Sequence, residues 1–214
     1  MPTLSVSSLR CVDCWPETEL AKRLFDLVCS ALGLLLLSPL LLVIVAWIRL
    51  DSPGPALFHQ TRIGRFGVPF TIHKFRTMRV EPGAAITVGA DPRITRAGRL
   101  LRASKLDELP QLWDVLRGAM SLVGPRPELP RYVELYPAAM RERVLSVRPG
   151  VTDPASLAFS HEAELLAAAG DPEREYREVI LPAKLQLSAD YAAEASVATD
   201  LRLILRTLGR VLRG

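Results

Sequence analysis

The chain of 214 residues has a formal net charge of +4 and is 49% hydrophobic, with a mean hydropathy of +0.20. This length allows one domain with a substantial core, and a basic, apolar composition is typical of proteins that meet an anionic membrane surface or a phosphorylated ligand. The composition argues against nucleic acid as a partner, because the sequence has no helix-turn-helix or RNA-binding signature and little aromatic interleaving.

Residues 1–21 are predicted to form a poorly ordered tail, because they lack the basic start and the small-residue cleavage site of a signal peptide. Cys11 and Cys14 have the spacing of metal ligands, but no second pair follows, so a tail is favoured over a zinc site. The three cysteines of the chain do not fit a disulfide framework, which indicates a reducing compartment.

Residues 24–48 form an apolar stretch in which Asp26 is the one charged residue. Roughly 20 apolar residues suffice for a helix to cross a bilayer. Ser38 and Pro39 interrupt the stretch, because proline lacks a backbone donor and its ring clashes with the preceding turn. Basic residues at both ends would also keep both ends on the cytoplasmic side. The residues alone therefore leave a spanning helix and a re-entrant helix-break-helix hairpin, at residues 22–50, equally open.

Residues 57–61 and 69–74 are predicted to pair as a short antiparallel hairpin, since glycines lie between the two runs. The second strand leads into Lys74 and Arg76, which would present two cations on a loop. This arrangement suits either a solvated strand end or a clamp for phosphate groups.

Residues 95–103 are predicted to form a helix with a cationic face, because arginine recurs at every third position from residue 93 to residue 102. Arg102 is the last of these arginines. The face would meet solvent, anionic lipid headgroups or phosphate groups. Residues 81–91, rich in Gly and Ala, are predicted to be a loop.

Asp107 and Glu108 follow directly and are surrounded by cations, which should keep both acids ionised. Neighbouring residues on a helix point about 100° apart, so these two cannot oppose each other across a sugar as in glycosidases. The pair suits a division of labour in which one carboxylate attacks as a nucleophile and the other holds a divalent cation. The alternative is an ordinary helix start, where acids favour the N-terminal dipole.

Arg126 lies between Pro125 and Pro127, which fix the backbone around it and suit bidentate binding of a phosphate. Further helices are predicted at 109–116, 162–169, 171–191 with a break at Pro182, and 200–212. The last is basic and amphipathic, which suits either docking on the domain or a position in the membrane interface.

The predicted fold is a mostly helical α/β domain, residues 51–214, with a small antiparallel hairpin, interfacial amphipathic helices and the membrane helix in front. No large sheet is expected.

Several segments in fixed order resemble the bacterial sugar transferase family, the monotopic phosphoglycosyl transferases that start glycan assembly on polyprenol phosphate. The resemblance covers the chain from about Lys22 onward and fits a small form with the catalytic core alone. The segments that carry it are 51–55, 74–78, 91–95, 106–112 and 121–128.

The resemblance implies transfer of a phospho-sugar from a UDP-sugar to undecaprenyl phosphate, with release of UMP, at the cytoplasmic face of the inner membrane. It implies that Asp107 is the nucleophile of a phosphoglycosyl-aspartate intermediate, and that Glu108, with Asp107 beside it, holds Mg²⁺. It makes the reaction the first membrane step of polysaccharide or glycoconjugate biosynthesis.

The resemblance also assigns positions around the substrate. Lys74, Arg102 and Arg126 match residues near the phosphates, and Arg76 and Glu128 are further substrate-binding candidates, as is Asp200. Ser38 and Pro39 match the break that makes the membrane helix re-entrant, so the resemblance favours that topology.

The chain departs from many relatives at Ala119, where they have an acid, and at residues 151–156, where they have Gly and an Ala-Gln pair. The sugar is therefore not implied. A non-catalytic membrane scaffold is the alternative function. A CDP-dependent lipid-alcohol transferase would need several spanning segments, and a homodimer has no interface signal in the sequence.

Overall fold

The computed structural model describes residues 17–79 and 91–211, so most of the predicted tail and the loop at 81–90 lie outside it. The first helix, α1, begins at Glu17. Residues 17–21, which we predicted as part of the tail, are therefore helical. Glu19 pairs with Arg65 in the domain, and this contact helps to hold the first turns of α1 in place.

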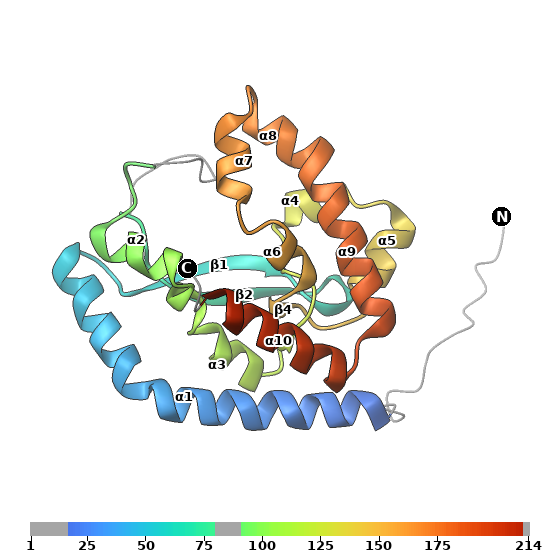
Figure 1. The fold of residues 1–214 in the computed structure, drawn as a ribbon, viewed down its shortest axis with the longest axis horizontal. Helices are drawn as coiled ribbons and strands as arrows, with labels where there is room; N and C mark the ends of the chain where they lie inside the picture. Colours follow the sequence, from blue (N-terminus) through green and yellow to red (C-terminus); the bar gives the residue numbers. More distant parts are fainter. Residues whose placement is uncertain (1–16, 80–90, 212–214) are drawn as a thin grey trace, which may run out of the picture.

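The described part is mostly helical and contains two small sheets of two strands each (Figure 1), which agrees with the expectation of no large sheet. The elements in chain order are α1 Glu17–Asp51, β1 Leu57–Ile63, η1 Arg65–Gly67, β2 Pro69–Phe75, α2 Arg96–Ala103, η2 Leu106–Glu108, α3 Gln111–Leu116, β3 Ser121–Val123, α4 Pro130–Val133, α5 Ala138–Val144, β4 Gly150–Thr152, α6 Pro154–Ala158, α7 Glu162–Ala168, α8 Pro172–Glu175, η3 Tyr176–Ile180, α9 Leu181–Glu194 and α10 Val197–Val211.

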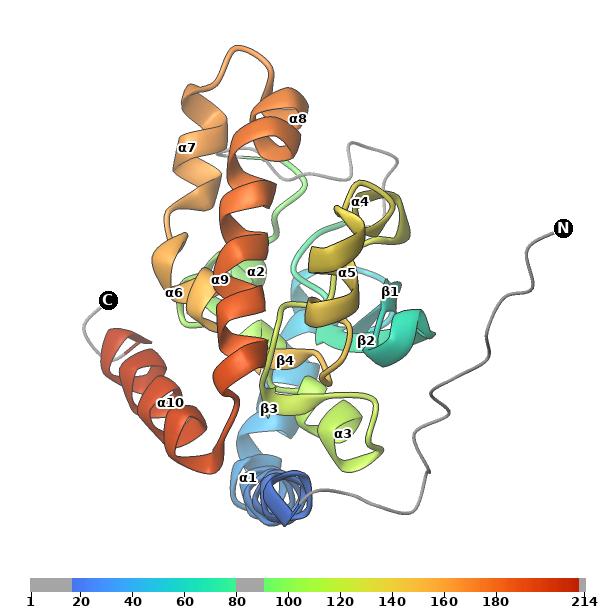
Figure 2. The same cartoon turned by 90° about the vertical axis from the view of Figure 1, so that its right-hand side faces the viewer.

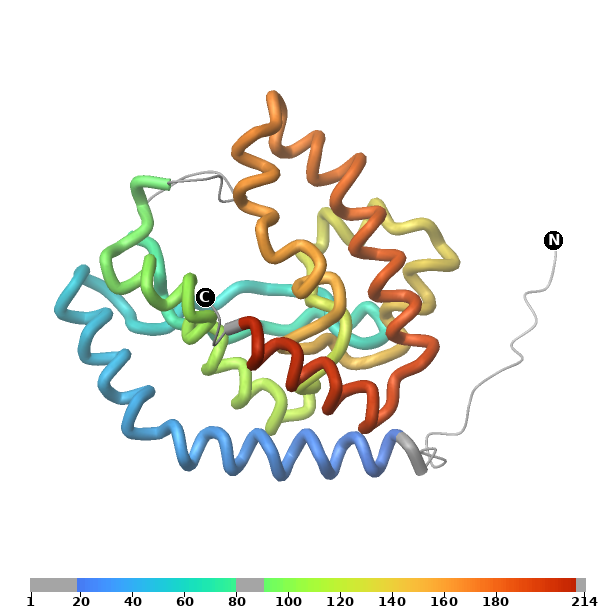
Figure 3. The backbone as a smooth tube through the Cα atoms, viewed as in Figure 1, coloured from blue at the N-terminus to red at the C-terminus, as the bar shows by residue number. Residues whose placement is uncertain are grey.

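Helix α1 is one continuous helix that bends in its middle, as the ribbon and the tube both show (Figures 1 and 3). Pro39 cannot donate to the carbonyl of Leu35, one turn earlier. The Ser38 hydroxyl donates to that carbonyl instead, at 2.8 Å. The predicted interruption is thus present as a bend, and no reversal of the chain occurs there. By length and composition α1 is able to cross a membrane.

The first half of α1 is attached to the domain through charged side chains. Lys22 donates to the carbonyl of Val123 at 3.0 Å, and Arg23 donates to two carbonyls at the end of α3 at 2.7 and 2.9 Å. Buried Asp26 accepts from a backbone amide of β3 at 3.0 Å. Because backbone groups at buried helix and strand ends need partners, these contacts fix α1 along the base of the domain (Figure 2).

The second half of α1 is attached through its apolar face. Ile44 and Ile48 are buried against Phe75 of β2 and against Ala97 and Leu101 of α2. Burial of apolar side chains is worth about 1.5–3 kcal/mol each, so this cluster holds the end of α1 firmly. Both halves of α1 are therefore part of the folded domain.

The predicted hairpin is confirmed. Strands β1 and β2 pair antiparallel from Leu57 opposite Phe75 to Ile63 opposite Pro69. The parallel pair β3–β4 was not predicted, because three-residue strands have no readable periodicity.

The predicted helices at 95–103, 109–116, 162–169 and 200–212 correspond to α2, α3, α7 and α10. The predicted break at Pro182 is wrong: the chain continues from α8 through the π-helical turn η3 into α9. Proline at the start of α9 removes a backbone donor, and the wider π turn accommodates this loss without ending the helix.

Gly98 provides a test of the packing between α2 and the segment after β2. A Cβ atom at Gly98 would lie 2.0 Å from the carbonyl oxygen of Thr77, whereas Gly209 of α10 has open space around it. We expect Gly98→Ala to lower the free energy of unfolding by about 1–3 kcal/mol through overpacking. Gly209→Ala should raise it by up to about 1 kcal/mol, because alanine favours the helix.

Denaturant unfolding of both variants in the same detergent measures this difference. Equal midpoints for the two variants would contradict the close packing of α2.

Candidate active site

Asp107 and Glu108 lie on the short helix η2, between α2 and α3. Lys105 precedes them with a φ of 57°, in the left-handed region that lysine rarely adopts. This residue reverses the chain after α2, so that the next residues face back toward β2. Backbone strain of this kind is frequent at functional sites.

Lys74 and Arg126 converge on Glu108. The Lys74 ammonium lies 2.6 Å from Oε1 of Glu108, and the Arg126 guanidinium lies 2.7 Å from the same oxygen. The three residues come from β2, from η2 and from the loop after β3. The structure therefore brings together three residues that the sequence predicted for one site.

The burial of Glu108 by itself would raise the pKa of its carboxyl group. The charges of Arg126 and Lys74 and their hydrogen bonds outweigh burial and lower this pKa below its usual value. Glu108 is therefore ionised, as expected.

Asp107 behaves differently from its neighbour. Burial and the negative charge of Glu108 raise the pKa of Asp107, although Lys74, Lys105 and Arg102 act in the opposite direction. Within residues 17–79 and 91–211, no side chain forms a salt bridge with the Asp107 carboxylate. The two acids thus differ: Glu108 is held by two cations, while Asp107 is left available.

The position of Lys74 depends on its neighbour His73. Buried Asp114 of α3 accepts a hydrogen bond from the His73 amide at 2.9 Å, and its second oxygen lies 2.6 Å from Nδ1 of His73. Since side chains alternate along a strand, fixing His73 against α3 directs Lys74 to the opposite face.

Arg76 does not reach this site. Its side chain is 4% exposed, and its guanidinium donates to the carbonyl of Pro53 at 2.6 Å and to the carbonyl and hydroxyl of Ser52 at 2.7 and 2.9 Å. Strand β2 ends at Phe75, so the alternation that directs Lys74 to the site no longer holds at Arg76. Arg76 instead satisfies carbonyl groups just after the end of α1.

Glu128 lies behind the Arg126 loop and is 8% exposed. Its carboxylate accepts a hydrogen bond from the Tyr176 hydroxyl at 2.8 Å and lies 3.7 Å from the Arg62 guanidinium. Arg62 also donates to the carbonyl of Pro127 at 3.2 Å. No sequence pattern singled out Arg62, because a single arginine in a strand is ordinary.

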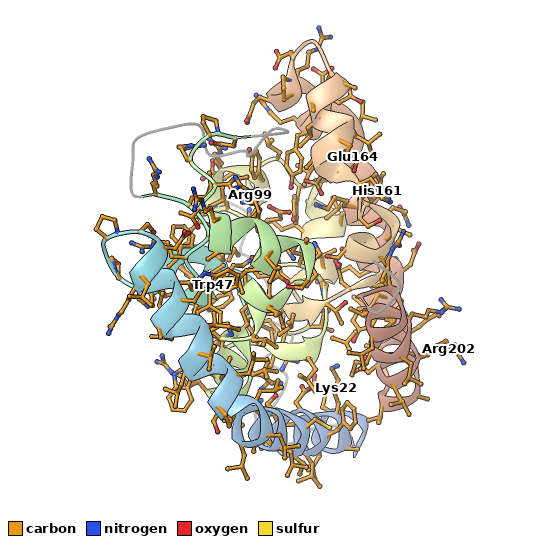
Figure 4. All side chains as sticks on the ribbon, turned by 60° about the vertical axis from the view of Figure 1, so that its left-hand side comes forward. Lys22, Trp47, Arg99, His161, Glu164 and Arg202 are labelled. Atoms are coloured by element: carbon orange, nitrogen blue, oxygen red, sulfur yellow. The ribbon has the colours of Figure 1, made fainter. Side chains whose placement is uncertain are left out.

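The Asp200 carboxylate pairs with the Lys22 ammonium and accepts a hydrogen bond from the Tyr191 hydroxyl at 2.6 Å. Figure 4 shows Lys22 between α1 and the rest of the domain, whereas Arg202 projects outward from α10. Asp200 therefore joins α10 to α1 rather than lining the Asp107–Glu108 site.

Two small cavities lie beside Arg126 and Glu128, each of about 10 Å³. A volume of this size holds about one water molecule. Neither of these two cavities accommodates a sugar, and neither is lined by Asp107 or Glu108.

The acidic pair is compatible with Mg²⁺. In the described part of the chain no group of three or more His, Cys, Asp or Glu side chains is arranged to hold a metal. Magnesium, however, is commonly held by one or two carboxylates together with substrate phosphates and water. Lys74 and Arg126 both contact Oε1 of Glu108, so its second carboxylate oxygen and the neighbouring Asp107 carboxylate are the donors that fit a magnesium ion that arrives with a diphosphate.

Comparison with known proteins supports an enzymatic site. Residues 17–214 match the family described as "Bacterial sugar transferase". A UDP-glucose:undecaprenyl-phosphate glucose-1-phosphate transferase of Caulobacter vibrioides is 41% identical over 199 residues, which cover 91% of this chain and 70% of the relative.

Two further relatives differ in length. A protein of Escherichia coli with the same name is 36% identical over 89% of this chain and 40% of its own length. The exopolysaccharide production protein PSS of Rhizobium leguminosarum bv. phaseoli is 38% identical over 87% of this chain and 92% of its own length. The chain thus spans less than half of the Escherichia coli relative and nearly all of the Rhizobium relative.

The role of Arg76 is testable by stability. Arg76→Met would leave the carbonyls of Ser52 and Pro53 without their partner, and we expect a loss of about 1–3 kcal/mol in the free energy of unfolding. Arg99→Met, at an exposed arginine of α2 (Figure 4), should change it by less than about 0.5 kcal/mol.

Denaturant unfolding gives both values. If Arg76→Met kept full stability and only weakened substrate binding, Arg76 would be a substrate residue after all.

Proposed function

The chain belongs to the bacterial sugar transferase family, and we propose that it transfers a phospho-sugar from a UDP-sugar to a polyprenyl phosphate, with release of UMP. Relatives named as UDP-glucose:undecaprenyl-phosphate glucose-1-phosphate transferases support this donor and acceptor. The observation that carries the proposal is the convergence of Lys74 and Arg126 on Glu108, next in the chain to the available carboxylate of Asp107.

In the first step, an Asp107 oxygen attacks the β-phosphorus of the UDP-sugar. A bond between phosphorus and the aspartate oxygen forms, the bond between this phosphorus and the bridging oxygen breaks, and UMP leaves with the electron pair. The raised pKa of Asp107, caused by burial and by Glu108, makes its ionised form a stronger nucleophile.

In the second step, a phosphate oxygen of the polyprenyl phosphate attacks the same phosphorus. The bond to Asp107 breaks, and the carboxylate is restored. The product is a polyprenyl diphosphate sugar. Division into two displacements lets a water-soluble donor and a lipid acceptor use one site in turn.

Lys74 and Arg126 supply positive charge for the transferred group. Both now donate to one oxygen of Glu108, at 2.6 and 2.7 Å. A phosphate oxygen is an acceptor of the same kind, so a diphosphate would find two donors already aimed at one place. Phosphoryl transfer depends mainly on such positioning and charge neutralisation. Arg102, whose charge lowers the pKa of Asp107, would add to this field.

Glu108, with Asp107 beside it, would hold Mg²⁺ in this reaction. When bound, the ion supplies further neutralisation of the diphosphate charge. The contribution of the protein is the ionised Glu108 carboxylate, whose pKa is lowered by Arg126 and Lys74 against the effect of burial.

Both ends of α1 contact the domain, and this supports a re-entrant position in one leaflet of the cytoplasmic membrane. A spanning helix would place one end on the far side of the bilayer, away from Val123 or from Phe75. Near the bend, Leu35 and Leu36 are 70% and 75% exposed, as expected of residues that face lipid.

The outer face of α10 carries Leu201, Leu205 and Leu208 together with Arg202 and Arg206, whereas Arg210 donates to the carbonyl of Leu157 in the domain. This combination suits a helix that lies in the interface of an anionic leaflet. With α1 along the base of the domain and α10 on its lower flank (Figure 2), the active site would face the cytoplasm next to the membrane.

Asp107→Asn tests the two-step reaction. Purified protein with Mg²⁺ and radiolabelled UDP-sugars, but without acceptor, should become covalently labelled and form UMP. The asparagine variant should lose the label and more than about a thousandfold in transfer rate, because the nucleophile is absent. Asp190→Asn, at an exposed aspartate of α9, is the matched control and should behave as wild type.

The opposite result would be UMP that forms only when polyprenyl phosphate is present, with no labelled protein at any quench time. Direct displacement would then replace the covalent intermediate.

The membrane topology is tested by single cysteines at Ala21→Cys in α1 and Gly209→Cys in α10, in a background with the native cysteines replaced. Both positions should resist an impermeant maleimide in spheroplasts and react after permeabilisation. The reason is that the start of α1 and the end of α10 are both expected on the cytoplasmic side. Labelling of the Ala21→Cys protein in intact spheroplasts would instead show a spanning helix.

A further inference from the structure

The loop that carries Arg126 has an unusual backbone. Pro125 and Pro127 have no amide hydrogen, so the amide of Arg126 is the one backbone donor in this tripeptide. A buried backbone donor without an acceptor is costly, and the acceptor chosen here therefore helps to decide where the residue lies.

That acceptor is Asp153. The Arg126 amide donates to Oδ2 of Asp153 at 3.2 Å, while Oδ1 accepts from the amide of Ser156 at 2.7 Å. Asp153 is 1% exposed, and it is the N-cap of α6. One buried carboxylate thus joins the start of α6 to the backbone of a residue that contacts Glu108.

The route by which Asp153 reaches the loop is rigid. It follows β4 directly, and β4 pairs in parallel with β3, which leads into the Arg126 loop. The amide of Gly124 donates to Thr152 at 3.1 Å, and the amide of Gly150 donates to Pro125 at 3.0 Å. A Cβ atom at Gly150 would lie 2.0 Å from the nitrogen of Gly124, so only glycine permits this approach.

A helix cap alone does not explain this arrangement, as a second Asp-Pro pair in the chain shows. Asp171 precedes Pro172 and caps α8, where it accepts from the Arg174 amide at 3.1 Å. Its side chain makes no other hydrogen bond within the described residues. Asp153 makes the equivalent cap and adds a bond to Arg126.

We propose that Asp153 is a positioning residue: its carboxylate fixes the backbone of Arg126, so that the guanidinium meets Glu108 and the substrate phosphates in one orientation. This role rests on the proposed phosphoglycosyl transfer. It also gives a role to Asp153 within the segment 151–156. An arginine that binds a phosphate with two parallel hydrogen bonds tolerates little displacement. The bond from the Arg126 amide to Asp153 would limit this displacement.

Asp153→Ser is the informative variant. Serine is a good N-cap, so it keeps the bond to the Ser156 amide, but its hydroxyl is too short to reach Arg126 as well. Asp171→Ser is the matched control at the other Asp-Pro pair. Asp153→Asn, which has one acceptor oxygen in place of two, serves if the serine variant does not fold.

Hydrogen–deuterium exchange measures how well the bond to Asp153 protects the Arg126 amide, and it needs no enzymatic turnover. Between Pro125 and Pro127 only the Arg126 amide exchanges, so two overlapping peptides that differ by this tripeptide isolate the exchange of Arg126. We expect this amide to exchange at least about tenfold faster in Asp153→Ser than in wild type, because its acceptor is lost. Unchanged exchange at Arg126 would overturn the proposal.

A double-mutant cycle with Arg126→Ala measures whether Asp153 affects the transfer activity through Arg126. Asp153→Ser should lower kcat/KM by about 10–100-fold in the wild-type background and by less than about twofold when Arg126 is already absent. Equal losses in both backgrounds, or an activity equal to that of Asp171→Ser, would show that Asp153 does not act through Arg126.

The two proposals fail in different ways. Wild-type protein that transfers no sugar phosphate from any UDP-sugar would contradict the proposed function, while the exchange result would still decide whether Asp153 holds Arg126. A protected Arg126 amide in Asp153→Ser, with active wild type, would contradict the positioning role alone.

Discussion

One oxygen of Glu108 accepts from both Lys74 and Arg126, and the geometry of the site depends on this shared contact. Buried ions are costly unless each is paired, so removing Glu108 would leave two cations without the partner they share. The contact also ties β2, η2 and the loop after β3 at one point. Asp107 is excluded from this ion pairing, and its carboxylate has the raised pKa that burial and Glu108 produce.

The elements around this point are held by a small set of backbone constraints. Lys105 turns the chain at the end of α2, and Asp114 fixes His73 and hence the direction of Lys74. Gly124 and Gly150 allow β3 and β4 to approach closely. Since these constraints fix η2, β2 and the loop after β3, which carry the three charged residues, those residues have little freedom to separate.

Helix α1 belongs to the same structural unit. Its first half is attached to carbonyls of α3 and β3 by Lys22 and Arg23, and its second half packs through Ile44 and Ile48 on β2 and α2. Arg76, which we predicted near the substrate, instead donates hydrogen bonds to the carbonyls of Ser52 and Pro53, just after the end of this helix. In the proposed membrane position of α1, this attachment would set the height of the acidic pair above the bilayer, which suits the proposed transfer from a soluble donor to a lipid acceptor.

The sequence by itself determined the features that depend on neighbouring residues. The hairpin and the helices at 95–103, 109–116, 162–169 and 200–212 follow from local periodicity, and the Asp107–Glu108 pair with its cations is visible as a motif. The short helices α4, α5 and α6 were not predicted. Only the tertiary structure decided the partners of Arg76, the link from Asp153 to Arg126 and the short parallel pair β3–β4. These contacts join residues that are distant in the chain. Each is made by a single side chain or by strands of three residues, so none of them produces a periodic pattern in the sequence.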